Sequence, residues 1–249
     1  KYADSIDLGY IDSLDFKVNG EKVKWQFLNE QIDISELLLT KPLKPGDSII
    51  ITTPFRVKIP SGKFSRLGHI GQSYQITQWF AKPAVFDKNG WHPMSYLDQG
   101  EFFSEFGNYD VSITVPKNYV LMATGDLQNK EELEFLNEKA ELTSQLIKEN
   151  KLAVRDSLGR KDMSFPKSSV EKKTLRFIQK NVHDFAWFTD KRYHVLKGEV
   201  NVNNRKITSW ALFTNNEAKL WRRSIEYIND ATRYFSKWVG EYPYNHVTA

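Results

Sequence analysis

Residues 78–124 read QWFAKPAVFDKNGWHPMSYLDQGEFFSEFGNYDVSITVPKNYVLMAT and decide the fold. The first part of this stretch is unusually rich in aromatic side chains, namely Trp79, Phe80, Phe86, Trp91, Tyr96, Phe102, Phe103 and Phe106. Each buried aromatic ring removes a large apolar area from water, so a solvated linker would not carry so many. The stretch therefore predicts an ordered, packed loop followed by two strands.

Strand patterns flank this loop. Asn19-Gly20 supplies the two positive φ angles of a tight turn between strands at 13–18 and 22–28. Alternating or β-branched runs bounded by Pro and Gly predict further strands at 48–53, 55–59, 74–80, 100–106, 109–115 and 174–179. The chain is therefore expected to be mainly β, an antiparallel saddle-like β-sandwich.

Two segments predict helices. Residues 131–151 are charged, with a loose apolar stripe of Leu133, Leu136, Ala140 and Ile147, and predict a surface helix inserted between two strands. Residues 161–169 look like a loop. Residues 217–239 give the stronger helix pattern. Mostly apolar residues recur there every three or four positions, namely Trp221, Ile225, Ile228, Thr232, Phe235 and Trp238. Asn215 or Asn216 is expected to cap its start, and Gly240 with Pro243 to end it.

Composition narrows the function classes. The 35 basic and 31 acidic residues leave a net charge of +4 in mixed order, so no nucleic-acid-binding stripe emerges. The absence of cysteine excludes disulfides and thiolate metal sites. Apolar runs are too short for a membrane span. Composition leaves the compartment open.

Candidate catalytic groups are few. The five histidines contain no pair at HExxH spacing, which a zinc site of that type needs so that both imidazoles reach one metal. Asp98, Glu101 and Glu105 could form an acid cluster, but strand periodicity places Glu101 and Glu105 on one face and Phe102 and Phe106 on the other, which argues against catalysis there. His92 before Pro93 is expected to anchor the loop. We therefore predict no catalytic and no metal-ligating residue in this chain.

Three segments carry a family resemblance. Residues 78–124, FAWFTDKRYHV (185–195) and GEYPYNHVTA (240–249) together resemble the N-terminal region of the zinc aminopeptidase family of gluzincins, the alanyl aminopeptidase and leukotriene hydrolase type. The match is best to the bacterial branch, which has QW followed by an aromatic residue. The resemblance implies that residues 1–203 are most of the N-terminal β domain, with its first strands missing. It implies that residues 204–249 are the first strand and helix of the thermolysin-like α/β catalytic domain, ahead of HExxH.

The resemblance also suggests substrate-binding residues. In the family, a segment resembling TQxE places a glutamine and then an acid near the free amino group of the substrate. Here Thr77-Gln78-Trp79-Phe80 keeps the glutamine and has Phe80 at the place of the acid. The resemblance thus implies Gln78 as a substrate-side residue and Phe80 as pocket lining. In an equally simple interpretation, Gln78 satisfies backbone groups of the loop.

Two functional hypotheses follow. By resemblance, the parent protein is a bacterial zinc metallopeptidase, cytoplasmic or periplasmic, that binds peptide substrates and hydrolyses them at their N-termini. This chain alone would then be inactive without the remainder of the catalytic domain and its zinc. Alternatively, the chain is a non-catalytic β-sandwich module that uses exposed aromatics such as Trp91 or Tyr96 to bind a carbohydrate or a protein partner.

Overall fold

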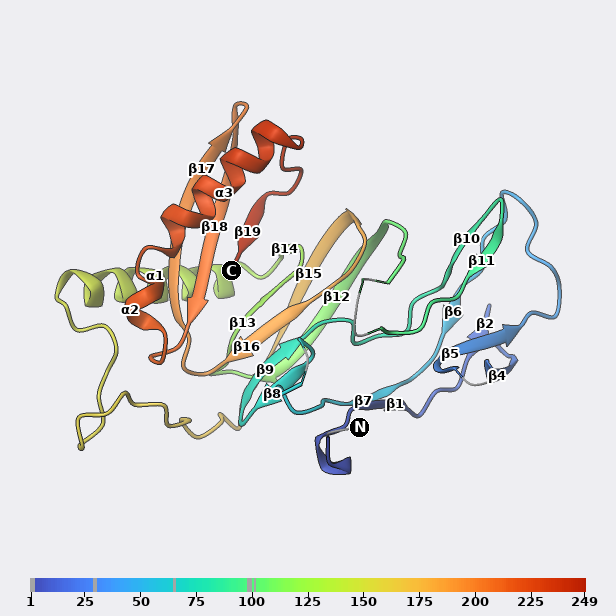
Figure 1. The fold of residues 1–249 in the computed structure, drawn as a ribbon, viewed down its shortest axis with the longest axis horizontal. Coiled ribbons are helices and arrows are strands. Elements are labelled where there is room, and N and C mark those ends of the chain that lie inside the picture. The colour runs from blue at the N-terminus through green and yellow to red at the C-terminus, as the bar shows by residue number, and fades with distance from the viewer. Residues whose placement is uncertain (1–2, 29–30, 65, 98–99, 101) are drawn as a thin grey trace. The chain divides into compact units, whose positions relative to one another are not determined.

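The computed structural model describes residues 3–28, 31–64, 66–97, 100 and 102–249 (Figure 1). The chain divides into two compact units. Unit 1 comprises residues 1–69 and 78–106, and unit 2 comprises residues 70–77 and 107–249. The predicted fold class, mainly β with antiparallel sandwich sheets and a closing α/β piece, is confirmed. The proposed domain boundary at 203/204 is a different division, and it stays a prediction.

Unit 1 consists of short antiparallel strand pairs. Its elements are the 3₁₀ helix η1 (Ser5–Asp7) and the strands β1 (Tyr10–Asp12), β2 (Lys17–Val18), β3 (Glu21–Lys22), β4 (Lys24–Leu28), β5 (Gln31–Leu38), β6 (Ile51–Thr52), β7 (Arg56–Lys58), β10 (Val85–Asp87) and β11 (Gly90–His92). β1 pairs with β7, β2 lies between β3 and β6, β4 pairs with β5, and β10 pairs with β11. The division between the units falls within β8 (Gly68–Ile70).

The hairpin predicted at Asn19-Gly20 is present. Val18 of β2 faces Glu21 of β3, and both turn residues have positive φ, 52° at Asn19 and 89° at Gly20. A two-residue turn of this kind matches the twist of the flanking strands, which explains why the dipeptide predicted it.

Unit 2 holds the longer strands and the α-helices. Its strands are β9 (Ser73–Ile76), β12 (Gly107–Pro116), β13 (Val120–Ala123), β14 (Asp126–Leu127), β15 (Lys172–Val182), β16 (Trp187–Asp190), β17 (His194–Val202), β18 (Arg205–Phe213) and β19 (His246–Thr248). The helices are α1 (Lys130–Lys148), α2 (Ala218–Trp221) and α3 (Ser224–Trp238). One sheet has the order β12-β15-β14, the next has β13-β16-β9, and the last has β17-β18-β19 with β19 parallel to β18.

Helix α1 covers β17 in unit 2 (Figure 1). Leu136 and Ala140 of the helix are buried in one cluster with Val195 and Trp210, so the apolar stripe faces a core. The predicted surface helix is therefore confirmed, although Leu133 of the predicted stripe points outward. Apolar spacing located the helix but underestimated its packing.

The predicted helix 217–239 is broken. α2 and α3 are separated at Arg222 and Arg223, and α3 lies along β17 and β18 (Figure 1). Ile228 is buried, whereas Phe235 and Trp238 are 65% and 71% exposed within this chain.

The predicted caps are wrong too. Glu217 occupies the N-cap position of α2. Asn215 instead donates its side-chain amide to Asp162 O at 2.8 Å.

Two strand predictions need correction. Residues 102–106 form no strand, because β12 starts only at Gly107, and β9 already ends at Ile76 instead of continuing to Phe80. β16 lies between β13 and β9 in its sheet. Asp98 and Glu101 of the suggested acid cluster lie outside the described residues, and Glu105 is exposed.

Candidate substrate-side loop

Gln78 stands out by its backbone. It lies two positions after the end of β9, is half-buried, and has φ 50°. In this left-handed region the Cβ of an L-residue crowds the following carbonyl, which costs about 1–2 kcal/mol. Strain of this kind persists only where the surrounding structure imposes it, and it clusters at functional sites. Gln78 is thus held in a defined orientation at the start of the aromatic loop.

Phe80 belongs to an aromatic cluster of unit 1. Its ring meets Trp79 edge-on with centroids 5.3 Å apart, and Trp79 in turn lies 5.9 Å from Phe55. The Lys82 Nζ lies 5.4 Å from the Phe80 centroid and 3.8 Å from that of Phe102. Since cations are attracted to aromatic faces, the Phe80 ring lies in an environment that accommodates an ammonium group.

The hairpin β10–β11 forms the outer part of the loop. Val85 is buried, whereas the cross-strand pair Phe86 and Trp91 is exposed, 65% for each residue, with ring centroids 4.9 Å apart. His92 Nε2 lies 2.8 Å from Asp87 Oδ1, and this close contact holds the pKa of the Asp87 carboxyl below its usual value. The interaction ties the two strands together, in agreement with the expected anchoring role of His92.

The histidines do not converge on a metal. His194 Nε2 is 2.6 Å from Asn215 Oδ1, and His246 Nε2 is 2.7 Å from Gly125 O. Burial lowers the pKa of His194, which favours its neutral form. Within the described ranges, no group of three His, Cys, Asp or Glu side chains could hold a metal ion. The residues present therefore do not fit a zinc site.

Unit 2 contains a cavity that the sequence did not indicate. It has a volume of about 350 Å³ and is lined by residues of β13, β15, β16, β18 and β19, including Ala123, Phe188 and Leu212, and by Tyr244, which precedes β19. The Tyr244 hydroxyl donates to Asn181 O at 3.0 Å, and none of the lining side chains is charged. Such a cavity suits an apolar group. Residues from all three resemblance segments, 78–124, 185–195 and 240–249, line it, but none of these segments indicated a cavity.

Comparisons with known proteins give fold likenesses only. No protein-family model matches the chain, and no curated protein matches it. Solved structures do match. A two-domain M1 zinc metallopeptidase mutant bound to L-arginine is 14% identical with a TM-score of 0.53, over 98% of this chain and 47% of that one. An M1 zinc metallopeptidase from Deinococcus radiodurans is 15% identical with a TM-score of 0.51, over 96% and 46%.

A mutant M1 zinc metallopeptidase from Deinococcus radiodurans bound to a Tyr-Ser-Ala substrate is 15% identical with a TM-score of 0.50, over 96% of this chain and 47% of that one. The chain therefore spans about half the length of the solved structures that it matches. At this identity the likeness shows the fold. Among the described residues, no helix is long and apolar enough to cross a membrane.

Proposed function

We propose that this chain is the N-terminal, substrate-gating portion of a zinc-dependent metallopeptidase of the gluzincin aminopeptidase type, bacterial branch. The supporting observation is the fold likeness to M1 zinc metallopeptidases over nearly the whole chain. One of these relatives was solved with a tripeptide substrate, which supports peptides as the substrate class. In this proposal the full-length protein hydrolyses peptides at their N-termini, and this chain alone is inactive.

Gln78 and Phe80 are the proposed substrate-side residues. Gln78 has a positive φ, and its side-chain carbonyl oxygen can accept a hydrogen bond from a substrate ammonium. Phe80 would line the pocket, with its ring offering a cation–π contact in place of a carboxylate. Zinc in the full-length protein would be held by residues outside this chain, because the described residues lack a suitable cluster.

The remainder of the catalytic domain is the proposed partner of α3. Leu220 of α2 and Tyr227, Tyr234 and Trp238 of α3 follow one another at helical spacing and are all more than half exposed. The Tyr234 and Trp238 rings stack with centroids 5.0 Å apart. This apolar stripe lies beside the one that packs on β17 and β18, so α3 has a second face for packing.

The alternative function is a non-catalytic binding module. The exposed Phe86–Trp91 pair favours it, because adjacent aromatic faces on a hairpin can stack on a sugar ring or dock a protein partner. In this alternative the loop would bind its ligand without any contribution from a catalytic domain.

One experiment separates the two functions. The coding sequence downstream of Ala249 is determined, and the longer product is purified and assayed for bound zinc and for hydrolysis of aminoacyl reporter substrates. We expect an HExxH motif within about a hundred residues, one zinc per chain, and hydrolysis that a chelator abolishes. A longer product with neither zinc nor hydrolysis would overturn the proposal. Retained glycan or protein binding that Trp91→Ala removes would then favour the binding module.

A further inference from the structure

The connection between α1 and β15 is unusually long. Residues 149–171 contain no helix or strand, apart from a single bridge between Arg155 and Lys161. Connections of more than about 12–15 residues without secondary structure are uncommon in compact domains and are usually functional or disordered. Several of its apolar side chains are exposed, with Val170 at 93%. Apolar packing therefore holds mainly the start of this segment, where Leu152 and Ala153 pack against the core cluster that contains Leu196 and Phe213.

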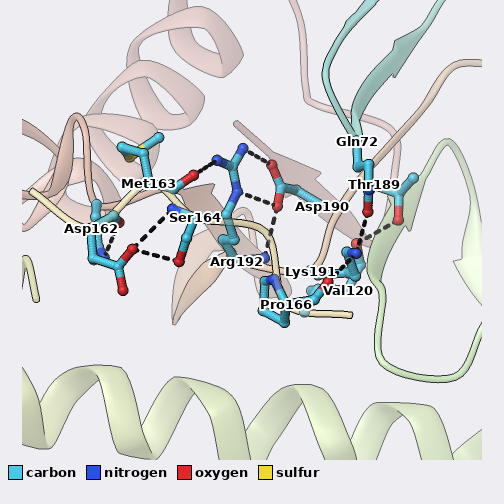
Figure 2. A network of polar contacts seen from close by, with 11 residues as sticks. Gln72, Val120, Asp162, Met163, Ser164, Pro166, Thr189, Asp190, Lys191 and Arg192 are labelled. Carbon is cyan, nitrogen blue, oxygen red and sulfur yellow. Dashed lines mark hydrogen bonds and ion pairs between the residues drawn. The ribbon is translucent and has the colours of Figure 1, made fainter. Parts of the chain in front are cut away.

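The Arg192 side chain, 13% exposed, makes the first polar attachment of the segment. The Arg192 guanidinium makes a two-pronged contact with Asp190, Nε to Oδ1 at 2.9 Å and Nη2 to Oδ2 at 2.6 Å, and its Nη1 donates to Met163 O at 2.7 Å (Figure 2). Asp190 is fully buried, and its Oδ1 also accepts the Arg192 backbone N–H at 2.8 Å. The fork geometry fixes the guanidinium so that its Nη1 group points at the connecting segment.

The neighbouring lysine makes a second attachment. The buried Lys191 ammonium donates to Pro166 O, to Gln72 Oε1 and, at 3.1 Å, to Ser168 Oγ (Figure 2). It thereby links the connecting segment with the turn that precedes β9. Because a buried ammonium needs all its donors satisfied, these bonds are expected to form and break together.

Phe165 supplies the aromatic part of the attachment. The Arg192 Cζ lies 3.5 Å from the centroid of its ring, which is a close cation–π contact. The same ring closes against Gly71, where an added Cβ would stand 2.7 Å from Phe165 Cε2. The ring is thus held between a guanidinium and a glycine, in a slot that a larger residue at position 71 would close.

From these contacts we propose that residues 161–169 form a strap that opens as one unit while the sheets of unit 2 stay closed, with Phe165, Lys191 and Arg192 as its latch. The sheets of unit 2 bury Leu175, Phe177 and Val195 almost completely, whereas the strap depends on a few polar bonds and one half-buried ring. Segments with few buried apolar contacts open at lower free energy than core strands. Opening uncovers the turn 190–192 and its charged side chains.

Hydrogen exchange of the purified chain tests the latch. Phe165→Ala removes the ring but leaves the Arg192–Asp190 pair intact, and Arg192→Lys keeps the charge but loses the fork and the stacking. We expect the amides of Asp162, Ser164 and Ser169 to exchange about 10- to 30-fold faster in both variants, with β15 and β17 unchanged. Arg160→Gln is the matched control, because Arg160 pairs with Asp156 outside the latch.

Three results would overturn the latch. The first is strap exchange in both variants that stays at the wild-type rate. The second is exchange that accelerates equally in the strap and in β15 and β17, since the contacts would then support the whole unit and not a separately opening strap. The third is an acceleration of strap exchange by Arg160→Gln as large as that by Phe165→Ala. The protection of the strap amides would then depend on the whole connecting segment and not on the latch.

Discussion

At the scale of the residue, Gln78 combines backbone strain with a proposed substrate contact. Asparagine adopts positive φ more readily than glutamine, so Gln78→Asn should raise the free energy of unfolding by about 0.5–1 kcal/mol. The shorter side chain should nevertheless miss the substrate. In the full-length enzyme we expect kcat/KM to fall roughly 10- to 100-fold in this variant and in Gln78→Ala, because a hydrogen bond to a charged group contributes about 1.5–3 kcal/mol.

Ala153 offers a matched control for Gln78. It also has a positive φ, 67°, but lies in the connection after α1. Ala153→Asn should leave kcat/KM unchanged, whereas its stability also depends on the packing of Ala153 against the core cluster that contains Leu196 and Phe213. If both Gln78 variants kept wild-type kcat/KM and melted at a lower temperature, Gln78 would be a structural residue of the loop and not a substrate-binding one.

The partly buried phenol of Tyr193 should make the free energy of unfolding depend on pH in the alkaline range. Burial raises the pKa of this phenol from 10.0 to about 12. A group whose pKa is raised on folding contributes stability that is complete below its unfolded pKa and is lost as pH rises through the folded value. The protein should therefore lose stability of order 2 kcal/mol between about pH 10 and pH 12 from this group.

The tyrosinate absorbance reports this titration directly. Tyr193→Phe should remove a phenol that ionises near pH 12 and flatten the loss of stability above pH 10. Tyr242, whose pKa burial also raises to about 12, should still titrate late in that variant. An unchanged absorbance titration in Tyr193→Phe would contradict the assignment.

At the scale of the element, Gly198 sets how closely α3 approaches β17. A Cβ at this position would stand 2.3 Å from Ile225 Cγ2 and 3.0 Å from Ser209 Oγ. Gly198→Ala should therefore destabilise the protein by about 1–3 kcal/mol by overpacking. Adding Ile225→Ala removes the clashing methyl group, so the double variant should be more stable than the sum of the single effects predicts.

Urea unfolding measures this coupling. Gly107→Ala is the control, because the nearest atom to its added Cβ is 3.9 Å away, in Tyr109. Additive effects of Gly198→Ala and Ile225→Ala would mean that α3 does not rest directly on Gly198.

The pair Glu132–Lys173 joins α1 to β15 at a desolvation cost. Lys173 Nζ lies 2.6 and 2.8 Å from the two carboxylate oxygens, yet burial still raises the pKa of Glu132 and lowers that of Lys173. Lys173→Met leaves Glu132 buried without its partner, which should cost about 3–5 kcal/mol at neutral pH, whereas replacing both residues by methionine should be neutral or stabilising.

The pH dependence gives the sign of this effect. Because the pKa of Glu132 is raised on folding, its contribution is complete below pH 4.5 and is lost as pH rises through the folded value. Without the lysine, the pKa of Glu132 in the folded protein is higher still. In denaturant titrations, the free energy of unfolding of Lys173→Met should therefore keep falling to a higher pH than that of the wild type. An identical pH profile for the two proteins would exclude this account.

Local sequence patterns predicted where helices and turns lie better than they predicted which side chains these elements contact. The dipeptide Asn19-Gly20 fixed its hairpin, because two positive φ angles suffice. Periodicity located α3 but could not show that Phe235 and Trp238 extend beyond their packing partners. Asn215 satisfied the rule for a cap, yet His194 and Asp162, distant in sequence, hold its side chain. Tertiary partners of this kind are invisible to a local pattern.

The candidate site was predictable only in part. Gln78 was indicated by its motif, but its strained φ was not, since nothing in TQWF demands a left-handed residue. The cavity was missed because its walls come from strands separated by more than a hundred positions, from β13 to β19. Each wall residue alone looks like an ordinary core or edge residue.

At the scale of the whole molecule, we proposed that the zinc ligands lie outside this chain. The chain alone should therefore neither bind zinc nor hydrolyse peptides. His194 and His246 each have a hydrogen-bond partner within unit 2, and His92 pairs with Asp87 in unit 1. A zinc ion would have to break these contacts and find at least three ligands in one place. We therefore expect metal analysis of the purified chain to find far less than one zinc per molecule, with no turnover of aminoacyl reporters. One tightly held zinc per chain, lost on replacing any two of these histidines, would overturn this expectation and place a metal site inside the chain.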